Sequence, residues 1–241
     1  MLFRSLNQKI VELNKNIADQ KNQNDYLNAR LQQVTDYYNL HAEYQENSFN
    51  YLALGNSLTL IPGWGRGICS TKPDNDYYGI VESYLRQKSE SVVGYRYNFF
   101  VWERSSNRNS TLNLLDMMLS DKLNLVTIQL GENVRDTSKY ESDLESLIKY
   151  VRSKAPKAQV IVVGDFWNKE RSNQRKTAAE NQHCAFADLS EIMNDKNYQS
   201  KEGTECLLKN GKIIKVSKNA ETHPNDEGMQ YIADRIIECI K

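Results

Sequence analysis

The sequence predicts an α/β domain whose parallel sheet is covered by helices on both faces, preceded by a long N-terminal helix. After about residue 46, short β-rich runs alternate with stretches of helical periodicity, a pattern typical of parallel strands joined by helices. Before that point, apolar residues recur with heptad spacing instead. We therefore expect a coiled-coil helix at residues 1–45 and a globular domain at residues 46–241, long enough to bury a sizeable core.

The N-terminal segment carries one narrow apolar stripe. Neither glycine nor proline occurs between Leu2 and Gly55, and the stripe recurs in alternating steps of four and three residues. Its members are Leu6, Ile10, Leu13, Ile17, Gln20, Asn24, Leu27, Leu31, Val34 and Tyr38. Mostly β-branched residues at a positions, leucine at d positions and one asparagine within the seam favour a parallel dimer. The alternative is a single helix that lies along the protein's own globular part.

Short apolar runs predict the strands of the sheet. They occupy residues 51–54, 91–102, 124–130, 158–163 and 184–189. Apolar residues at helical spacing predict helices around residues 80–85, 112–119 and 144–151, and a final amphipathic helix over residues 229–240.

One segment departs from the alternation of strands and helices. Within residues 205–216, the pair Asn210-Gly211 lies between two apolar runs, which is a strong signal for a β-hairpin. The hairpin precedes the histidine nearest the C-terminus, His223.

The charge balance excludes several classes of partner. Lys+Arg and Asp+Glu are both 31, so no basic field exists to attract nucleic acid or an anionic membrane. No run approaches the roughly 20 apolar residues of a membrane span. The opening MLFRSL lacks the apolar core of a signal peptide. As the sequence stands we expect a soluble cytoplasmic protein, with association to the cell envelope as the alternative if an upstream anchor has been removed.

The four cysteines are Cys69, Cys184, Cys206 and Cys239. They lie far apart without a Cys-x-x-Cys pair, which argues against a zinc site or a redox motif. We expect small buried apolar residues, and an extracellular disulfide stays open as the alternative.

Ser57 stands just after the first predicted strand, in the stretch Gly55-Asn56-Ser57. Functional groups gather at the carboxyl ends of strands in an open α/β sheet, so Ser57 is a candidate nucleophile. Taken alone, the stretch favours a simpler role as the cap of the next helix. A nucleophilic serine also needs a base for its proton and donors for the oxyanion that forms.

His223 suits the role of the base. Pro224 favours an extended conformation at His223, and Asn225 or Asp226 is expected to cap the final helix, so His223 lies in a loop at the edge of the sheet. The alternative is a surface histidine that precedes a capped helix.

Two further positions offer oxyanion donors. Asn133 follows the predicted strand at 124–130, so its amide is placed to enter the same crevice as Ser57. Gly65 has no side chain, which lets its N–H approach a ligand closely. Each position also fits ordinary turn chemistry.

Ser57, Gly65, Asn133 and His223, in this order, resemble the four markers of the SGNH (GDSL-type) hydrolases. Further similarity lies in WGRGICS, NFFVWE, IQLGENV, VVGDFWN and HPNDEGMQYIAD, which span the globular part and none of the N-terminal helix. The resemblance implies a flavodoxin-like three-layer α/β/α sandwich. It also implies Ser57 as nucleophile and His223 as base. The oxyanion hole would comprise the N–H groups of Ser57 and Gly65 and the side chain of Asn133.

The sequence departs from this pattern at two positions. Asn56 stands where the family commonly has aspartate, and asparagine still bonds to the turn backbone. Ala220 stands where the family usually has the aspartate that orients the histidine. Glu221 lies two residues before His223, and in an extended segment both point to the same side. Either Glu221 orients the ring or a backbone carbonyl does, which leaves a dyad.

We expect a serine esterase that removes an acyl group, most simply O-acetyl, from a carbohydrate through an acyl-enzyme. The resemblance implies no metal and no organic cofactor. The candidates for substrate binding are Trp64, Arg66, Trp102 and Trp167, although each tryptophan also fits the core. The alternatives are a non-catalytic carbohydrate-binding or scaffolding module and an O-acetyltransferase that uses the same site.

Overall fold

The computed structural model of the chain describes residues 9, 12–17, 20, 41–61 and 63–241. The chain divides into two compact units, Met1–His41 and Ala42–Lys241. In the first unit residues 12–17 are helical, and the side chains of Leu13 and Ile17 are exposed. Apart from these two residues and Gln20, the predicted heptad stripe lies outside the described residues, so the coiled coil and the dimer stay predictions.

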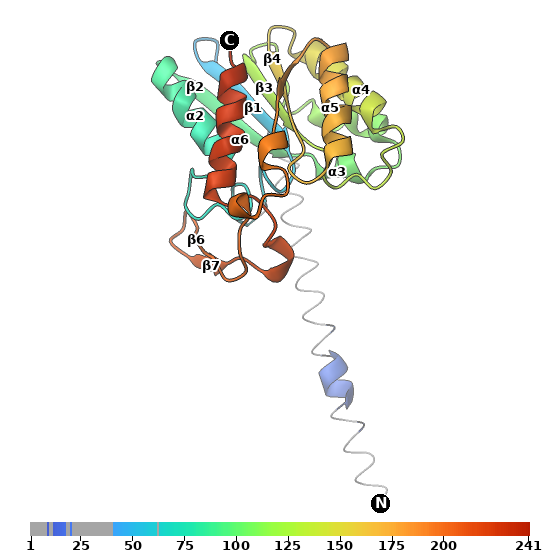
Figure 1. Cartoon of the computed structure of the whole chain (residues 1–241), viewed down its shortest axis with the longest axis vertical. Helices are drawn as coiled ribbons and strands as arrows, with labels where there is room; N and C mark the ends of the chain where they lie inside the picture. Colours follow the sequence, from blue (N-terminus) through green and yellow to red (C-terminus); the bar gives the residue numbers. More distant parts are fainter. Residues whose placement is uncertain (1–8, 10–11, 18–19, 21–40, 62) are drawn as a thin grey trace, which may run out of the picture. The chain divides into compact units, whose positions relative to one another are not determined.

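A five-stranded parallel sheet forms the centre of the second unit, in the order β2-β1-β3-β4-β5 (Figure 1). The strands are β1 (Phe49–Gly55), β2 (Val92–Asn98), β3 (Leu125–Gln129), β4 (Gln159–Val163) and β5 (Ala185–Ala187). The chain adds β2 on one side of β1 and then adds β3 to β5 on the other. In this flavodoxin-like order the direction of winding reverses at the carboxyl ends of β1 and β3, which is where open α/β sheets usually bind their ligands. The predicted parallel sheet is confirmed.

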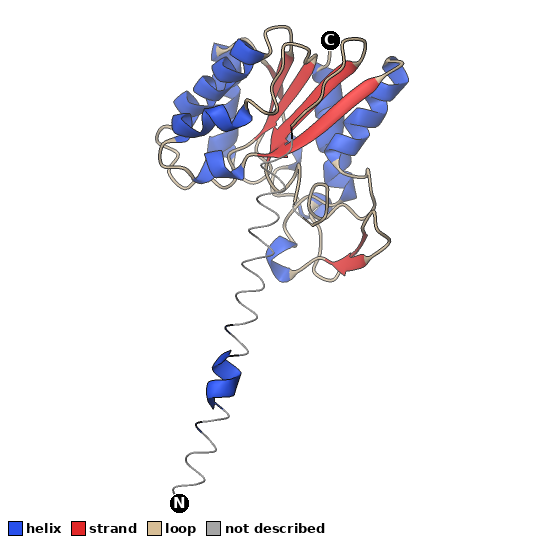
Figure 2. Ribbon diagram, turned by 180° about the vertical axis from the view of Figure 1, so that it is seen from behind, coloured by secondary structure: helices blue, strands red, loops and turns tan. Residues whose placement is uncertain are grey.

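Helices cover both faces of the sheet (Figure 2). In the described residues of this unit, the long helices are α2 (Tyr77–Lys88), α4 (Tyr140–Lys154), α5 (Lys169–Asn181) and α6 (Asp226–Cys239). The helices α2 and α6 pack together on one face, and α4 and α5 pack together on the other (Figure 1). Successive strand residues point to opposite faces, so alternate residues of β1, such as Tyr51 and Ala53, join the core cluster under α2 and α6. The predicted three-layer α/β/α arrangement is confirmed.

Three elements differ from the prediction. The run at residues 91–102 ends as a strand at Asn98 and continues as a short helix, α3 (Phe100–Arg104). The helix predicted around residues 112–119 is instead a 3-10 helix, η1 (Arg108–Leu115). The helix α5 was not predicted, because it buries only small residues and one arginine and therefore carries no apolar stripe.

The predicted β-hairpin is present and lies beyond the end of the sheet at which α6 begins (Figure 1). Its antiparallel strands are β6 (Glu205–Leu207) and β7 (Ile213–Lys215), and Gly211 between them has a φ of +81°. The hairpin packs through a small apolar cluster that includes Cys69, Cys206 and Ala220. This cluster connects the loop after Ser57 to the loop before His223.

The start of the second unit is attached to the sheet by an aromatic side chain. Tyr44 is 8 % exposed, donates a hydrogen bond to the carbonyl of Met118 (2.9 Å) and packs edge-on against Tyr95. Residues from Ala42 onward therefore belong to the packed globular part. Across the described part of the chain, no helix combines the length and the apolar character needed to cross a membrane.

Candidate active site

The predicted nucleophile lies at the carboxyl ends of β1 and β3. Gly55 ends β1, and a Cβ there would lie 1.9 Å from Oγ1 of Thr59, so only glycine permits the tight turn that follows. This turn brings Ser57 to the end of the sheet, where it is half-buried. The carbonyl of Asn56 accepts hydrogen bonds from the N–H groups of Thr59 (3.0 Å) and Leu60 (2.9 Å), which holds the turn in place.

The structure brings Ser57 and His223 together, although they are 166 residues apart in the sequence. Oγ of Ser57 lies 3.4 Å from Nε2 of His223. The other ring nitrogen, Nδ1, lies 3.1 Å from the carbonyl oxygen of Ala220. Because a carbonyl only accepts, Nδ1 carries the hydrogen and Nε2 is left as an acceptor for the serine hydroxyl.

His223 is held in the neutral form that a base requires. Burial lowers its pKa from the ordinary value of 6.5, and the hydrogen bond to Ala220 offsets only part of this. The backbone carbonyl of His223 accepts from the N–H of Ser200 (2.8 Å), and the ring packs edge-on against Trp167 at 5.3 Å between centroids. The ring is thus fixed from several sides.

The expectation that Glu221 orients His223 is wrong in this structure. It assumed an extended segment, whereas Lys218–Ala220 form a 3-10 turn and Glu221 itself has helical backbone angles. In a helical turn the carbonyl three residues back faces the ring, so Ala220 takes that place. The carboxylate of Glu221 instead lies 2.7 Å from Nζ of Lys218, and the two side chains are 31 % and 70 % exposed.

The carbonyl of Ala220 has a second side-chain partner. Sγ of Cys69 lies 3.3 Å from it, and burial raises the pKa of this thiol to about 12, so it stays protonated and donates. Cys69 adopts a left-handed backbone conformation with a φ of +69°. The loop that follows Ser57 therefore contacts the carbonyl that orients the base.

The three predicted oxyanion donors differ in availability. Within the described residues, the backbone N–H of Ser57 donates no hydrogen bond to another backbone group. Asn133 is half-buried, and one hydrogen of its side-chain amide goes to Oε2 of Glu103 at 2.8 Å, which leaves the second hydrogen for a ligand. The N–H of Gly65, however, donates to the carbonyl of Ile61 at 3.2 Å. The expectation for Gly65 is therefore not met in this conformation.

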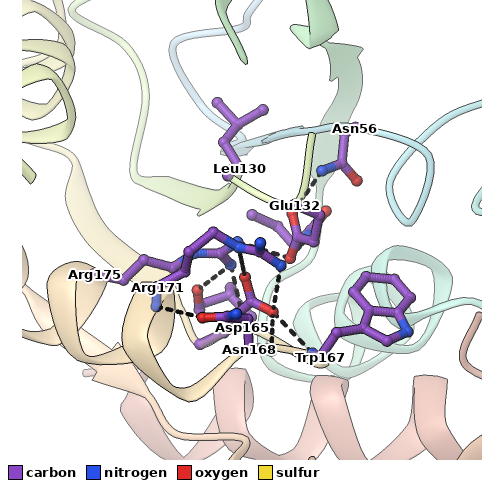
Figure 3. Close-up of polar contacts among 12 residues, drawn as sticks. Asn56, Leu130, Glu132, Asp165, Trp167, Asn168, Arg171 and Arg175 are labelled. Carbon is purple, nitrogen blue, oxygen red and sulfur yellow. Dashed lines mark hydrogen bonds and ion pairs between the residues drawn. The ribbon is translucent and has the colours of Figure 1, made fainter. Parts of the chain in front are cut away.

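A buried network of charges supports the loops around the site (Figure 3). Nη2 of Arg175 lies 2.8 Å from Oε1 of Glu132 and 3.1 Å from Oδ2 of Asp165. Arg175 and Asp165 are fully buried, and Arg171 also pairs with Asp165. Burial would raise the pKa of Asp165, but the two guanidinium groups hold it below its ordinary range. The network leads from Glu132, beside Asn133, to Asp165 at the end of β4.

The network also reaches the base. Oδ1 of Asp165 accepts from the backbone N–H of Trp167 at 2.8 Å, and Nε1 of Trp167 donates to the carbonyl of Thr222 at 3.0 Å. Trp167 packs against His223, so one end of the network contacts the histidine loop. At the other end Glu132 contacts Asn56, the residue before Ser57.

A second carboxylate lies under the turn that carries Ser57. Glu103 is 1 % exposed, and its Oε1 accepts from Nδ2 of Asn56 at 3.0 Å. Nδ2 of Asn56 also donates to Oε2 of Glu132 at 2.6 Å. Burial and the charge of Glu132 raise the pKa of Glu103, although the N–H groups around it act in the opposite direction.

The four candidates for substrate binding divide into two pairs. Trp64 and Trp167 are half-buried and present surface near the loops of the site. Trp102 is fully buried and packs against Tyr140, and Arg66 is 1 % exposed. The expectation is wrong for Trp102 and Arg66, because side chains without accessible surface cannot contact a substrate in this conformation.

Several residues of the site escaped the sequence analysis. Asp165 and Arg175 are charged residues inside the core, and no local pattern distinguishes them from surface charges. Phe100, which is 46 % exposed and opens α3 beside the end of β1, was assigned to a strand. A signal existed for Glu103, because a single charge within the apolar run NFFVWE requires a buried partner. Within the described ranges, no cluster of three or more His, Cys, Asp or Glu side chains is arranged to hold a metal ion.

Comparison with known proteins agrees with the fold. No family model matches the sequence, and no curated protein matches it. Solved structures do match. Phospholipase A1 from Streptomyces albidoflavus is 15 % identical with a TM-score of 0.51, and the match covers 80 % of this chain and 99 % of that one. A catalytic mutant of Axe2, an acetylxylan esterase from Geobacillus stearothermophilus, is 15 % identical with a TM-score of 0.52, over 81 % of this chain and 96 % of that one.

A third match is a two-domain esterase active on acetylated mannans. It is 17 % identical with a TM-score of 0.55, over 88 % of this chain and 52 % of that chain. A putative GDSL-like lipase from Parabacteroides merdae also matches, at 15 % identity and a TM-score of 0.51, over 83 % of this chain and 99 % of that one. The globular unit has the fold of the SGNH hydrolases.

Proposed function

We propose that this chain is a serine ester hydrolase that removes O-acetyl groups from a carbohydrate through an acyl-enzyme on Ser57. The observation that carries the proposal is the 3.4 Å contact between Oγ of Ser57 and Nε2 of His223. It is supported by the hydrogen bond of Nδ1 to Ala220, which selects the tautomer able to accept the serine proton.

The chemistry follows from this arrangement. Nε2 of His223 takes the proton of Ser57 as Oγ attacks the carbonyl carbon of the ester, and the N–H of Ser57 and the amide of Asn133 stabilise the oxyanion. The imidazolium then returns the proton to the departing sugar oxygen, which leaves an acetyl group on Ser57. A water molecule activated by His223 attacks this ester and releases acetate. The Ala220 carbonyl stabilises the imidazolium in place of a carboxylate.

The choice of an acetylated glycan has two supports. Two of the structural neighbours are described as esterases of acetylated mannans and of acetylxylan, although others are a lipase and a phospholipase. The half-exposed rings of Trp64 and Trp167 and the exposed ring of Phe100 offer the flat apolar surfaces on which sugar rings stack.

Hydrolysis of p-nitrophenyl acetate and acetate release from a panel of acetylated xylans and mannans test the proposal. The wild type should release acetate, and Ser57→Ala should abolish release while it retains the fold, because only a hydroxyl is removed. Residual turnover within about tenfold of the wild type, or about 1.4 kcal/mol, would exclude the covalent mechanism.

The same assay separates the alternatives. A protein that binds the glycans without releasing acetate is a binding module. Transfer of acetyl to an added acceptor glycan in preference to water identifies an O-acetyltransferase. Release of fatty acid from phospholipid vesicles, without acetate release from the glycans, would refute the glycan assignment.

A further inference from the structure

No sequence motif assigned a role to Glu103. It lies on α3, which follows β2 directly, and β2 pairs with β1 so that Asn98 is in register with Gly55. The N–H of Phe99 donates to the carbonyl of Gly55 at 2.7 Å, which fixes the start of α3 against the end of β1. This connection places the Glu103 carboxylate beneath the loops that follow β1 and β3.

The carboxylate accepts N–H groups from both loops. From the loop after β3 it takes the side-chain amide of Asn133 (2.8 Å) and the backbone N–H groups of Gly131 (2.5 Å) and Asn133 (3.4 Å). From the loop after β1 it takes the side-chain amide of Asn56 (3.0 Å). A single buried group therefore joins the neighbour of Ser57 to Asn133.

These contacts define how the two amides point. In both contacts the amide nitrogen is the donor, so each asparagine turns its nitrogen toward Glu103 and its oxygen away. For Asn56 the other end agrees, because its Oδ1 accepts the N–H of Leu58 at 3.2 Å. An asparagine on a loop otherwise samples several rotamers, and the contact with Glu103 selects one of them.

From this we infer that Glu103 is a positioning residue: its carboxylate holds the side-chain amides of Asn56 and Asn133, and through Asn133 it aligns the oxyanion hole. The inference rests on the proposed function. It adds that the orientation of the Asn133 side chain depends on the carboxylate of Glu103. It also explains Asn56. An aspartate there would place a third carboxylate against Glu103 and Glu132 and would remove the N–H donors that bridge them.

A double-mutant cycle on p-nitrophenyl acetate hydrolysis tests the inference. Asn133→Ala should lower kcat by about 10²–10³, the cost of removing one oxyanion donor. Glu103→Gln should lower kcat on the order of 10²-fold, because a displacement of about 1 Å at a reacting group has that effect. The double variant should fall no further than Asn133→Ala alone, within about twofold, since Glu103 acts through Asn133.

A merely structural role predicts a different pattern. In that case Glu103→Gln would lower activity in the Asn133→Ala background as much as in the wild type, and this additivity overturns the inference. A Glu103→Gln enzyme with kcat within about threefold of the wild type, or about 0.7 kcal/mol, also overturns it. Glu82→Gln, which breaks an ion pair with Arg86 on the surface of α2, is the matched control and should leave kcat unchanged.

A measurement without substrate separates this inference from the proposed function. In the nitrogen–proton NMR spectrum of the full chain, the side-chain amide hydrogen of Asn133 that faces Glu103 should exchange with water more slowly than in free asparagine. Its signal, assigned by its loss in Asn133→Ala, should shift in Glu103→Gln. Exchange at the rate of free asparagine in the wild type overturns the inference, whether or not Glu103→Gln folds. An inactive wild type with protected amides would refute the proposed function alone.

Discussion

Glu221→Gln should leave kcat almost unchanged, because the base is oriented by a backbone carbonyl. Nδ1 of His223 lies 3.1 Å from the oxygen of Ala220, and the Glu221 carboxylate lies 2.7 Å from the ammonium of Lys218. A carboxylate that held the ring directly would contribute about 10⁴ in kcat, the effect seen when such an aspartate is neutralised in a serine protease. The two arrangements therefore predict effects that differ by several orders of magnitude.

The small effect expected of Glu221 has a calculable upper bound. Even at about 4 Å, a solvated unit charge changes the energy of the imidazolium by only about 1 kcal/mol at the dielectric constant of water. That energy corresponds to about fivefold in rate, before the opposite charge of Lys218 reduces it. We thus expect Glu221→Gln to retain at least about a fifth of the wild-type kcat.

The assay is the pH dependence of p-nitrophenyl acetate hydrolysis by the wild type, Glu221→Gln and a control. Glu205→Gln is the control, because it breaks another exposed ion pair, with Lys215 on the hairpin. All three should share the midpoint of the acidic limb. A loss of kcat greater than about tenfold, together with a lower midpoint in Glu221→Gln alone, would refute the backbone-carbonyl assignment and restore Glu221 to a triad.

Three further outcomes are expected. The kcat/KM should fall on acidification as His223 becomes protonated, with a midpoint below 6.5 because burial lowers its pKa; a midpoint above 6.5 would contradict that burial. Arg175→Met leaves Glu132 without its cation and the fully buried Asp165 with Arg171 alone, and it should cost about 3–5 kcal/mol of unfolding free energy in urea denaturation. Arg171→Met should cost less, since that side chain is 17 % exposed, and equal losses would refute the central place of Arg175. Removal of residues 1–41 should retain specific activity and convert a dimer to a monomer in light scattering; the same oligomeric state in both proteins would reject the coiled coil.

Local signals were sufficient to predict the five strands of the central sheet and the helices α2, α4 and α6. Strands buried on both faces read as continuous apolar runs, and α2, α4 and α6 present apolar stripes, so each of them is visible in its own segment. The helix α5 was missed for the converse reason. Its buried face consists of Ser172, Arg175, Ala178 and Ala179, and small or charged residues do not register as a stripe.

The sequence by itself determined that Ser57 and Asn133 follow strands and that His223 precedes the last helix, since these positions depend only on neighbouring residues. Parallel strands end at one edge of a sheet, so their meeting follows from the fold class. Only the tertiary structure decided which partners they have. Because of the 3-10 turn before His223, Nδ1 of the ring bonds to the carbonyl of Ala220 and not to Glu221. Glu103 contacts Asn133, which is 30 residues away in the sequence. Contacts between segments that are remote in the sequence depend on the distance between them and on their burial in the folded protein. Neither quantity can be read from a local pattern of residues.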